Sequence, residues 1–227
     1  MVVRSPAQDE AAQEDPAGAV SDEPAPRRRG RPPATDGPST EEIILRTARE
    51  AFGELGYDRT TFREIAERAG LTRPAVNHYF PGKRALYDAV FASTQDRVVT
   101  AGILSATPDP DVSVRLSAFL HAAADVDSQD RSFARFITSS LLDAVRHPEL
   151  ADHAEGQLEA LRTFTRSILE EGIAAGQVRE DLDVPAVTEM LLAIMWGMGL
   201  YAGFVGTHEQ LESVVDQFAM LLGGTLW

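Results

Sequence analysis

The stretch TFREIAERAGLTRPAVNHYFPGKRAL, residues 61–86, contains two short helical patterns joined by a tight turn. Ile65 lies on the apolar face of the first pattern, and Val76 and Phe80 lie four residues apart on the apolar face of the second. Gly70 stands between them, where a left-handed backbone would strain any other residue. The spacing predicts a helix-turn-helix whose apolar side chains fill the space between the helices.

The outward positions of the second helix carry hydrogen-bond donors and small apolar groups instead of the Glu and Lys pairs of a solvated face. They are Thr72, Arg73, Pro74, Ala75, Asn77, His78 and Tyr79. Taken alone, the spacing is equally consistent with a helical hairpin that has no role in DNA binding. The donor-rich face, the basic pair Lys83 and Arg84, and an arginine cluster upstream favour DNA binding.

Helical periodicity continues on both sides of this motif. Ser39 is a typical N-cap for a helix over about 40–55, which Gly56 ends. Downstream, the apolar spacing predicts helices over about 82–104, 110–126, 130–146, 149–175, 184–205 and 208–223. No stretch alternates with a period of two, so we expect an all-α protein with about nine helices.

The charge is unevenly distributed along the 227 residues, whose formal net charge is −14. Residues 1–26 carry a net charge of −5, residues 27–92 of +3 and residues 93–227 of −12. Whole-chain acidity therefore does not argue against a nucleic-acid partner. The chain has no cysteine and no apolar leader at its N-terminus, which predicts a cytoplasmic protein without disulfides.

Sequence signatures of enzymes are missing. There is no nucleophile elbow, phosphate-binding loop, dinucleotide fingerprint or zinc-protease motif. The five histidines are scattered, and the carboxylates Asp125, Asp127 and Asp130 are interpreted as helix caps and solvated loop residues. We therefore expect no enzymatic activity, no metal and no cofactor.

The helix-turn-helix stretch and its flanks resemble the DNA-binding domain of the TetR family of transcriptional regulators. The matching segments are AFGELGY (51–57), the pair Thr60 and Thr61, IAERAGLT (65–72) and VNHYFPGKRAL (76–86). The resemblance covers about residues 40–90. The sequence departs from the family pattern at Asn77, Tyr79 and Arg84, where Tyr, His and an acidic residue are common, and these departures bear on base preference.

The resemblance implies a role for each exposed residue of the motif. Contacts to phosphate are implied for Thr61, Thr72, Tyr79 and Lys83. Contacts to base edges are implied for Arg73, Pro74 and Ala75. Asn77 and His78 could contact either base edges or phosphates. Arg73 is the leading candidate for base recognition, because its planar fork matches the O6 and N7 atoms of guanine.

The C-terminal half matches the family in general plan, with one closer match in EGIAAGQVREDLDVPAVTEML, residues 171–191. By resemblance, the last two helices form a four-helix interface with a second copy.

Residues 190–207 carry no charge and just reach the length of a membrane span, but their glycines and the missing basic flank favour a packed helix. An apolar stripe suited to a partner follows: Leu211, Val214, Val215, Phe218 and Leu222.

A ligand pocket implied by the family would lie among the middle helices. The large side chains available there are Phe119, Phe133, Phe136, Phe164, Trp196 and Tyr201. Most of these are expected in the ordinary core, and Trp196 is the best single candidate for a pocket wall. Few basic residues lie near the apolar runs, which disfavours a strongly anionic effector.

Residues 29–32, Arg-Gly-Arg-Pro, resemble an AT-hook and precede the first helix. One interpretation is a solubilising charge run. The other places Arg29 and Arg31 in a narrow A·T minor groove, where the negative potential is strongest.

These observations predict a ligand-responsive, sequence-specific DNA-binding transcriptional regulator. The expected parts are a disordered arm (1–38), a helix-turn-helix domain (39–86) and a helical ligand-binding and dimerisation domain (87–227). The expected partners are a palindromic operator in double-stranded DNA, a small-molecule effector and a second copy of the chain, with no membrane. A homodimeric repressor that the effector releases from DNA is favoured. The alternatives are an architectural or activator protein without an effector, and a membrane-tethered helical protein.

Overall fold

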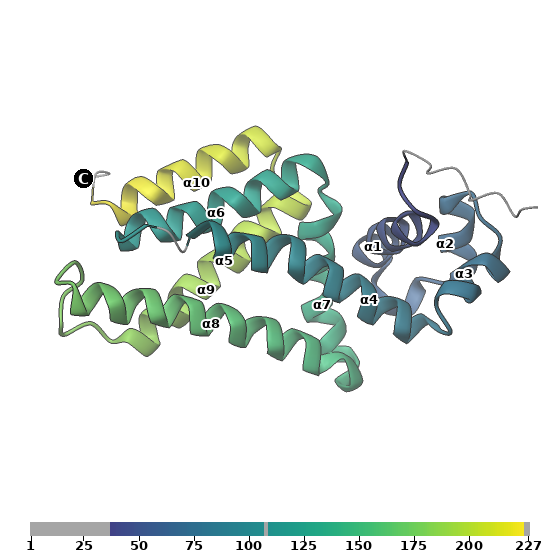
Figure 1. Ribbon diagram of the computed structural model, residues 1–227, viewed down its shortest axis with the longest axis horizontal. Helices are drawn as coiled ribbons and strands as arrows, with labels where there is room; N and C mark the ends of the chain where they lie inside the picture. The colour runs from purple at the N-terminus through teal and green to yellow at the C-terminus, as the bar shows by residue number, and fades with distance from the viewer. Residues whose placement is uncertain (1–36, 107–108, 225–227) are drawn as a thin grey trace, which may run out of the picture. The chain divides into compact units, whose positions relative to one another are not determined.

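The computed structural model describes residues 37–106 and 109–224, and Figure 1 shows their arrangement. The arm with Arg29 and Arg31 lies outside the described residues. Within them the chain forms helices and loops with no strand, which confirms the all-α prediction.

Four helices make up the N-terminal part. They are α1 (Thr40–Arg59), α2 (Phe62–Ala69), α3 (Arg73–Tyr79) and α4 (Lys83–Gln95). Ile44, Ile65, Val76 and Leu86, one from each helix, are fully buried in a common core. Gly70 has the left-handed backbone (φ 65°, ψ 28°) that the turn between α2 and α3 requires. The predicted helix-turn-helix is therefore present.

The remaining elements follow the predicted order. They are η1 (Asp96–Thr100), α5 (Ala101–Ala106), α6 (Val112–Gln129), α7 (Ser132–Arg146), η2 (Pro148–Leu150), α8 (Ala151–Ala174), α9 (Val184–Leu200), η3 (Tyr201–Val205) and α10 (His208–Leu222). The π-helical segment η1 joins α4 and α5 into one continuous helix, and η3 extends α9 in the same way. With these continuous helices counted once, and with η2 counted with α8, the described residues form the expected nine helices.

The end of α1 differs in detail from the prediction. Gly56 breaks the helix with φ 75° and ψ 174°, as expected, but helical structure resumes as far as Arg59. The buried hydroxyl of Thr60 donates to the carbonyl oxygens of Ala51 (3.1 Å) and Gly56 (2.8 Å). This side chain therefore gives two carbonyls near the break a hydrogen-bond donor at the end of α1.

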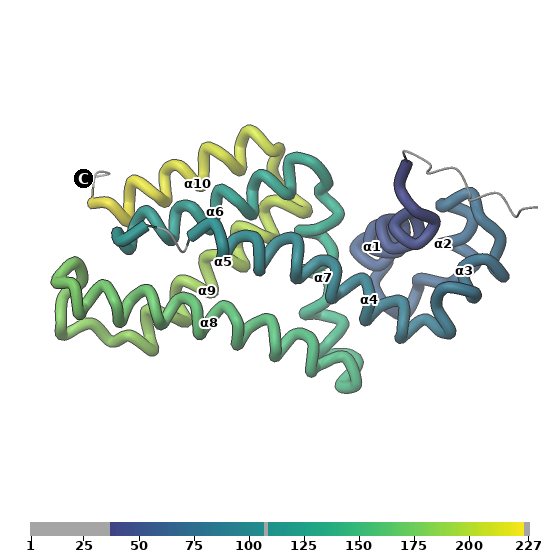
Figure 2. Tube along the Cα trace, in the orientation of Figure 1, coloured from purple at the N-terminus to yellow at the C-terminus, as the bar shows by residue number. Residues whose placement is uncertain are grey.

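Helix α7 packs along α1 and links the N-terminal core to the C-terminal helices (Figure 2). A Cβ atom added to Gly53 of α1 would lie 3.1 Å from the backbone nitrogen of Phe136, so the two helices are in close contact there. The hydroxyl of Ser139 donates to the Gly53 carbonyl (3.0 Å), and the backbone N–H of Tyr57 donates to Asp143 (3.0 Å). Packing and hydrogen bonds thus hold α1 against α7.

Candidate functional site

The exposed face of α3 carries the polar residues that the sequence predicted. Arg73, Asn77, His78 and Tyr79 are exposed, together with Pro74, and Ala75 is half-buried. The buried Val76 and Phe80 hold the opposite face against α1 and α2. Arg73 has no hydrogen bond or ion pair within residues 37–106 and 109–224, so its guanidinium is available to an external acceptor.

Two threonines cap the helices of the motif. The Thr61 hydroxyl accepts from the backbone N–H of Glu64 (3.2 Å), and the Thr72 hydroxyl accepts from that of Ala75 (3.3 Å). A hydroxyl that accepts in this way keeps its own proton for donation. Both side chains are exposed, so both can donate to a phosphate.

Lys83 holds the start of α4 against the end of α1. Its ammonium donates to the carbonyls of Tyr57 (2.7 Å) and Asp58 (3.2 Å) and lies 4.3 Å from the centroid of the Tyr57 ring. Sequence reasoning missed this bracing role. A contact between Lys83 and phosphate stays a prediction, because an ammonium has three donors and the side chain is only half-buried.

Arg84 has partners within the chain that the sequence did not indicate. Its Nε donates to Asp88 (2.6 Å) and its Nη1 donates to the Glu149 carbonyl. Asp88 also bonds to His153 of α8 (2.7 Å). Arg84 therefore ties α4 to η2, the short helix before α8. An influence of Arg84 on base preference stays a prediction.

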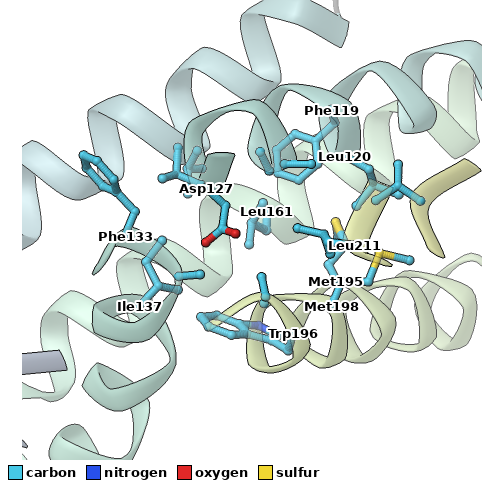
Figure 3. Close-up of a pocket in the computed structure, with 18 of the residues that line it drawn as sticks. Phe119, Leu120, Asp127, Phe133, Ile137, Leu161, Met195, Trp196, Met198 and Leu211 are labelled. Carbon is cyan, nitrogen blue, oxygen red and sulfur yellow. The ribbon is translucent and has the colours of Figure 1, made fainter. Parts of the chain in front are cut away.

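A second feature is a partly open cavity of about 100 Å³ lined by η1, η3 and helices α6 to α10 (Figure 3). Its wall is almost entirely hydrocarbon, and the larger members include Phe119, Leu120, Leu161, Met195, Met198 and Leu211. A cavity of roughly 150 Å³ with such a wall admits a benzene-sized molecule.

The structure divides the six predicted pocket residues into two groups. Phe119, Phe133 and Trp196 line the cavity. The other three do not: Phe136 packs against Tyr87 in the N-terminal core, Phe164 is buried with its ring centroid 5.3 Å from that of Phe119, and Tyr201 packs beside Gly206. Sequence indicated the size of these side chains but not their direction.

Asp127 is the main residue that sequence reasoning missed. Predicted as a cap or solvated residue, it is 3 % exposed and lines the cavity. Neither carboxylate oxygen has a hydrogen-bond partner within the described residues. Burial raises the pKa of Asp127, against the opposing charges of Arg131, His208 and Arg135. The apolar period of α6 contained the signal, because Leu120 and Ala124 lead to Asp127 on the same face.

Two further polar groups border this cavity. Gln157 of α8 is 2 % exposed and contributes an amide. The indole N–H of Trp196 has no acceptor among the described residues. The polar part of the wall thus offers an acceptor at Asp127, a donor at Trp196 and both at Gln157.

Arg49 of α1 connects the N-terminal core to the cavity wall. Its guanidinium is almost completely buried, donates to Asp130 (2.5 Å) and Ser132 (2.7 Å), and packs over the ring of Phe133. Phe133 lines the cavity. A side chain of the helix-turn-helix part therefore touches the wall of the ligand-sized space.

Helices α9 and α10 expose apolar side chains. The segment Val184–Val205 is long and apolar enough to cross a membrane by length and composition, and 17 % of its most apolar window is buried. The exposed members of the two helices are Met190, Leu200, Phe204, Val205, Val214, Met220 and Leu221. The predicted stripe of α10 needs a correction, because Leu211 and Val215 are buried within the chain's own core.

No cluster of metal-binding side chains occurs in the part that the structure describes.

Comparison with known proteins gives consistent matches. Residues 44–90 match the family model described as bacterial regulatory proteins, tetR family, and residues 107–218 match the tetracyclin repressor-like, C-terminal domain. The HTH-type transcriptional regulator YdeS of Bacillus subtilis (strain 168) is 27% identical over 203 residues, covering 85% of this chain and 91% of its own. The regulator SrpR of Pseudomonas putida is 25% identical over 185 residues, covering 80% and 83%.

Solved structures show the same fold. The ketosteroid transcriptional regulator KstR2 of Mycobacterium tuberculosis aligns with a TM-score of 0.68 at 22% identity, covering 83% of this chain and 95% of that one. The regulator FadR of Bacillus subtilis, in complex with stearoyl-CoA, aligns with a TM-score of 0.64 at 20% identity, covering 82% and 98%.

Proposed function

Because the chain belongs to the TetR family of helix-turn-helix transcriptional regulators, we propose that it is a cytoplasmic homodimeric repressor released from a palindromic operator by a small molecule. The observation that carries this proposal is the exposed face of α3, whose donor side chains lie opposite the buried core of α1 to α4. In this proposal the protein regulates transcription and catalyses no reaction.

Base recognition is assigned to α3 and backbone contacts to its flanks. Arg73 supplies a planar fork for guanine, with Pro74, Ala75, Asn77 and His78 beside it in the major groove. Thr61, Thr72, Tyr79 and Lys83 bind phosphates and set the register of the helix. Arg29 and Arg31 of the arm enter the adjacent minor groove.

Dimerisation is assigned to α9 and α10. One helix-turn-helix contacts only a half-site, so a two-fold symmetric operator requires two copies. Leu200 and Phe204, four residues apart on the α9–η3 helix, and Val214 on α10 are exposed apolar side chains that a second copy can cover.

Ligand response is assigned to the cavity and its contact with α1. An occupant that moves Phe133 also moves Arg49, and with it the helix that supports α2 and α3. The ligand and the operator then favour different positions of the helix-turn-helix, so each lowers the affinity of the other.

Selection of binding sites from a random duplex pool tests the proposal. The dimeric protein should enrich an inverted repeat, and a cell extract that contains the effector should dissociate the complex in a gel shift. If no sequence is enriched, the proposal that the chain is a sequence-specific regulator is wrong. Enrichment without any response to extract would favour an effector-free DNA-binding protein.

A further inference from the structure

We propose that the cavity binds a small apolar molecule that carries one hydrogen-bond donor, a hydroxyl or an ammonium group, and that Asp127 accepts this hydrogen bond. The inference rests on the proposed function only in treating the cavity as the effector site. Asp127 is the determinant of specificity, and the surrounding hydrocarbon wall selects the apolar body.

Asp127 is buried without a partner. Transfer of an unpaired polar group into an apolar interior is unfavourable by roughly 1–3 kcal/mol in mutational data, and more for a charge. Such a group is retained in a packed core most readily where it has an external partner to bind. The raised pKa of Asp127 agrees with this uncompensated burial.

The neighbouring cations are engaged with other groups. Arg131 donates to the carbonyls of Ala202 (3.2 Å) and Gly206 (2.5 Å), and Arg135 donates to that of Gly203 (2.7 Å). The Nε2 atom of His208 pairs with Glu212 on its own helix (3.2 Å), and its buried Nδ1 has no hydrogen-bond partner within the described residues. These residues act on Asp127 through their charge but make no hydrogen bond to it within the described residues.

The direction of the Asp127 side chain places its oxygens in the cavity. Figure 3 shows the carboxylate pointing into the space bordered by Ile137, Leu161 and Trp196. The volume of about 100 Å³ suits a molecule near the size of one aromatic ring.

The polar groups also define which end of the molecule is bound. An ionised carboxylate only accepts hydrogen bonds, so it favours a donor and repels an anion. No Lys or Arg is among the lining residues to offset that repulsion. A hydroxyl both donates and accepts hydrogen bonds, so it matches the acceptor at Asp127 and the donor at Trp196 in kind.

The test uses four probes with one ring and different polar ends: benzyl alcohol, benzylammonium, toluene and benzoate. Their affinities for the full-length protein are measured by calorimetry without DNA. Benzyl alcohol, benzylammonium or both should bind roughly tenfold or more tightly than toluene, the increment of a hydrogen bond to a charged group. Benzoate should bind most weakly. Which donor binds more tightly identifies the functional group of the effector.

Variants at two neighbouring positions separate a binding role from a structural one. Asp127→Leu should abolish the preference for donors over toluene and raise the melting temperature of the ligand-free protein. Asp127→Asn keeps an acceptor, so it should retain benzyl alcohol and lose any added affinity for benzylammonium. Asp125→Leu and Asp125→Asn are the controls, because Asp125 is exposed on the same helix, and they should leave the ranking unchanged.

Three results would overturn the inference. They are the absence of binding by any probe, a toluene affinity equal to that of both donors, and the same ranking in wild type and Asp127→Leu. A lower melting temperature in both Asp127 variants would assign the residue a structural role and also overturn it. If the donors bind as expected but leave operator binding unchanged, the cavity assignment stands and the proposed effector response fails.

Discussion

The guanidinium carbon of Arg49 lies 3.5 Å from the centroid of the Phe133 ring. Arg49 belongs to α1, whose other side holds the helix-turn-helix, and Phe133 belongs to the wall of the cavity. Such a cation–π contact is worth about 2 kcal/mol when both groups are desolvated. The pair is therefore a direct physical link between the two proposed binding sites.

Phe133→Leu should weaken the coupling between ligand and DNA. Leucine keeps an apolar wall but removes the ring from beneath Arg49. At saturating benzyl alcohol, the ratio of operator affinities without and with ligand should fall several-fold, measured by fluorescence anisotropy. Phe119→Leu is the control, since Phe119 lines the cavity without contacting Arg49. It should change ligand affinity while leaving that ratio intact. Equal coupling in both variants would exclude the proposed link.

Gly56→Ala should destabilise the protein. At φ 75° and ψ 174° the backbone occupies a region that is nearly exclusive to glycine, and a non-glycine residue there costs about 1–3 kcal/mol. The free energy of unfolding in urea measures the effect. Gly156→Ala is the matched control, because Gly156 lies inside α8 with open space at its Cβ position. That change should stabilise the protein by up to about 1 kcal/mol. Similar losses in both variants would contradict the backbone argument.

Asp127→Asn should change how stability depends on pH. Because the pKa of Asp127 is raised in the folded state, its carboxyl destabilises the fold as the pH rises above the unfolded value of about 3.9 and through the folded pKa. Arg131, His208 and Arg135 oppose this shift and Asp130 adds to it. The free energy of unfolding of the variant minus that of wild type should therefore increase from pH 4 toward neutrality. A difference that is constant across this range would show that the shift is absent.

Phe204→Glu should convert the proposed dimer to a monomer. Phe204 is about half-exposed on the α9–η3 helix, and an unpaired carboxylate buried there in the proposed interface would be strongly unfavourable. Light scattering after size exclusion gives the mass directly. Val145→Glu is the control, because Val145 is 83% exposed near the end of α7 and belongs to neither α9 nor α10. Dimers of unchanged mass in the Phe204 variant would place the interface elsewhere.

Local chemistry explains why the N-terminal part was predictable from sequence. The caps Ser39, Thr61 and Thr72 and the left-handed Gly70 each specify a helix boundary through their nearest neighbours. The outward face of α3 then follows from the buried positions three and four residues apart. The structure confirms these local features.

The cavity depends on contacts between distant helices and was only partly predictable. Phe133 and Phe136 lie three residues apart on α7, yet one lines the cavity and the other fills the N-terminal core. Periodicity shows that both are apolar positions but not which neighbouring layer each one meets. Asp127 was misassigned because residue type was given more weight than its place on the apolar face of α6.

The most direct test of the account is selection of binding sites with wild type and Arg73→Ala. Arg63→Ala is the control, because Arg63 is exposed on α2 and paired with Glu67 (2.8 Å). Wild type and the control should enrich the same inverted repeat. Arg73→Ala should lose preference at one symmetric position in each half-site, by about 1–3 kcal/mol per contact. An unchanged consensus for Arg73→Ala, or no inverted repeat with wild type, would contradict the assignment of α3 as the helix that recognises DNA.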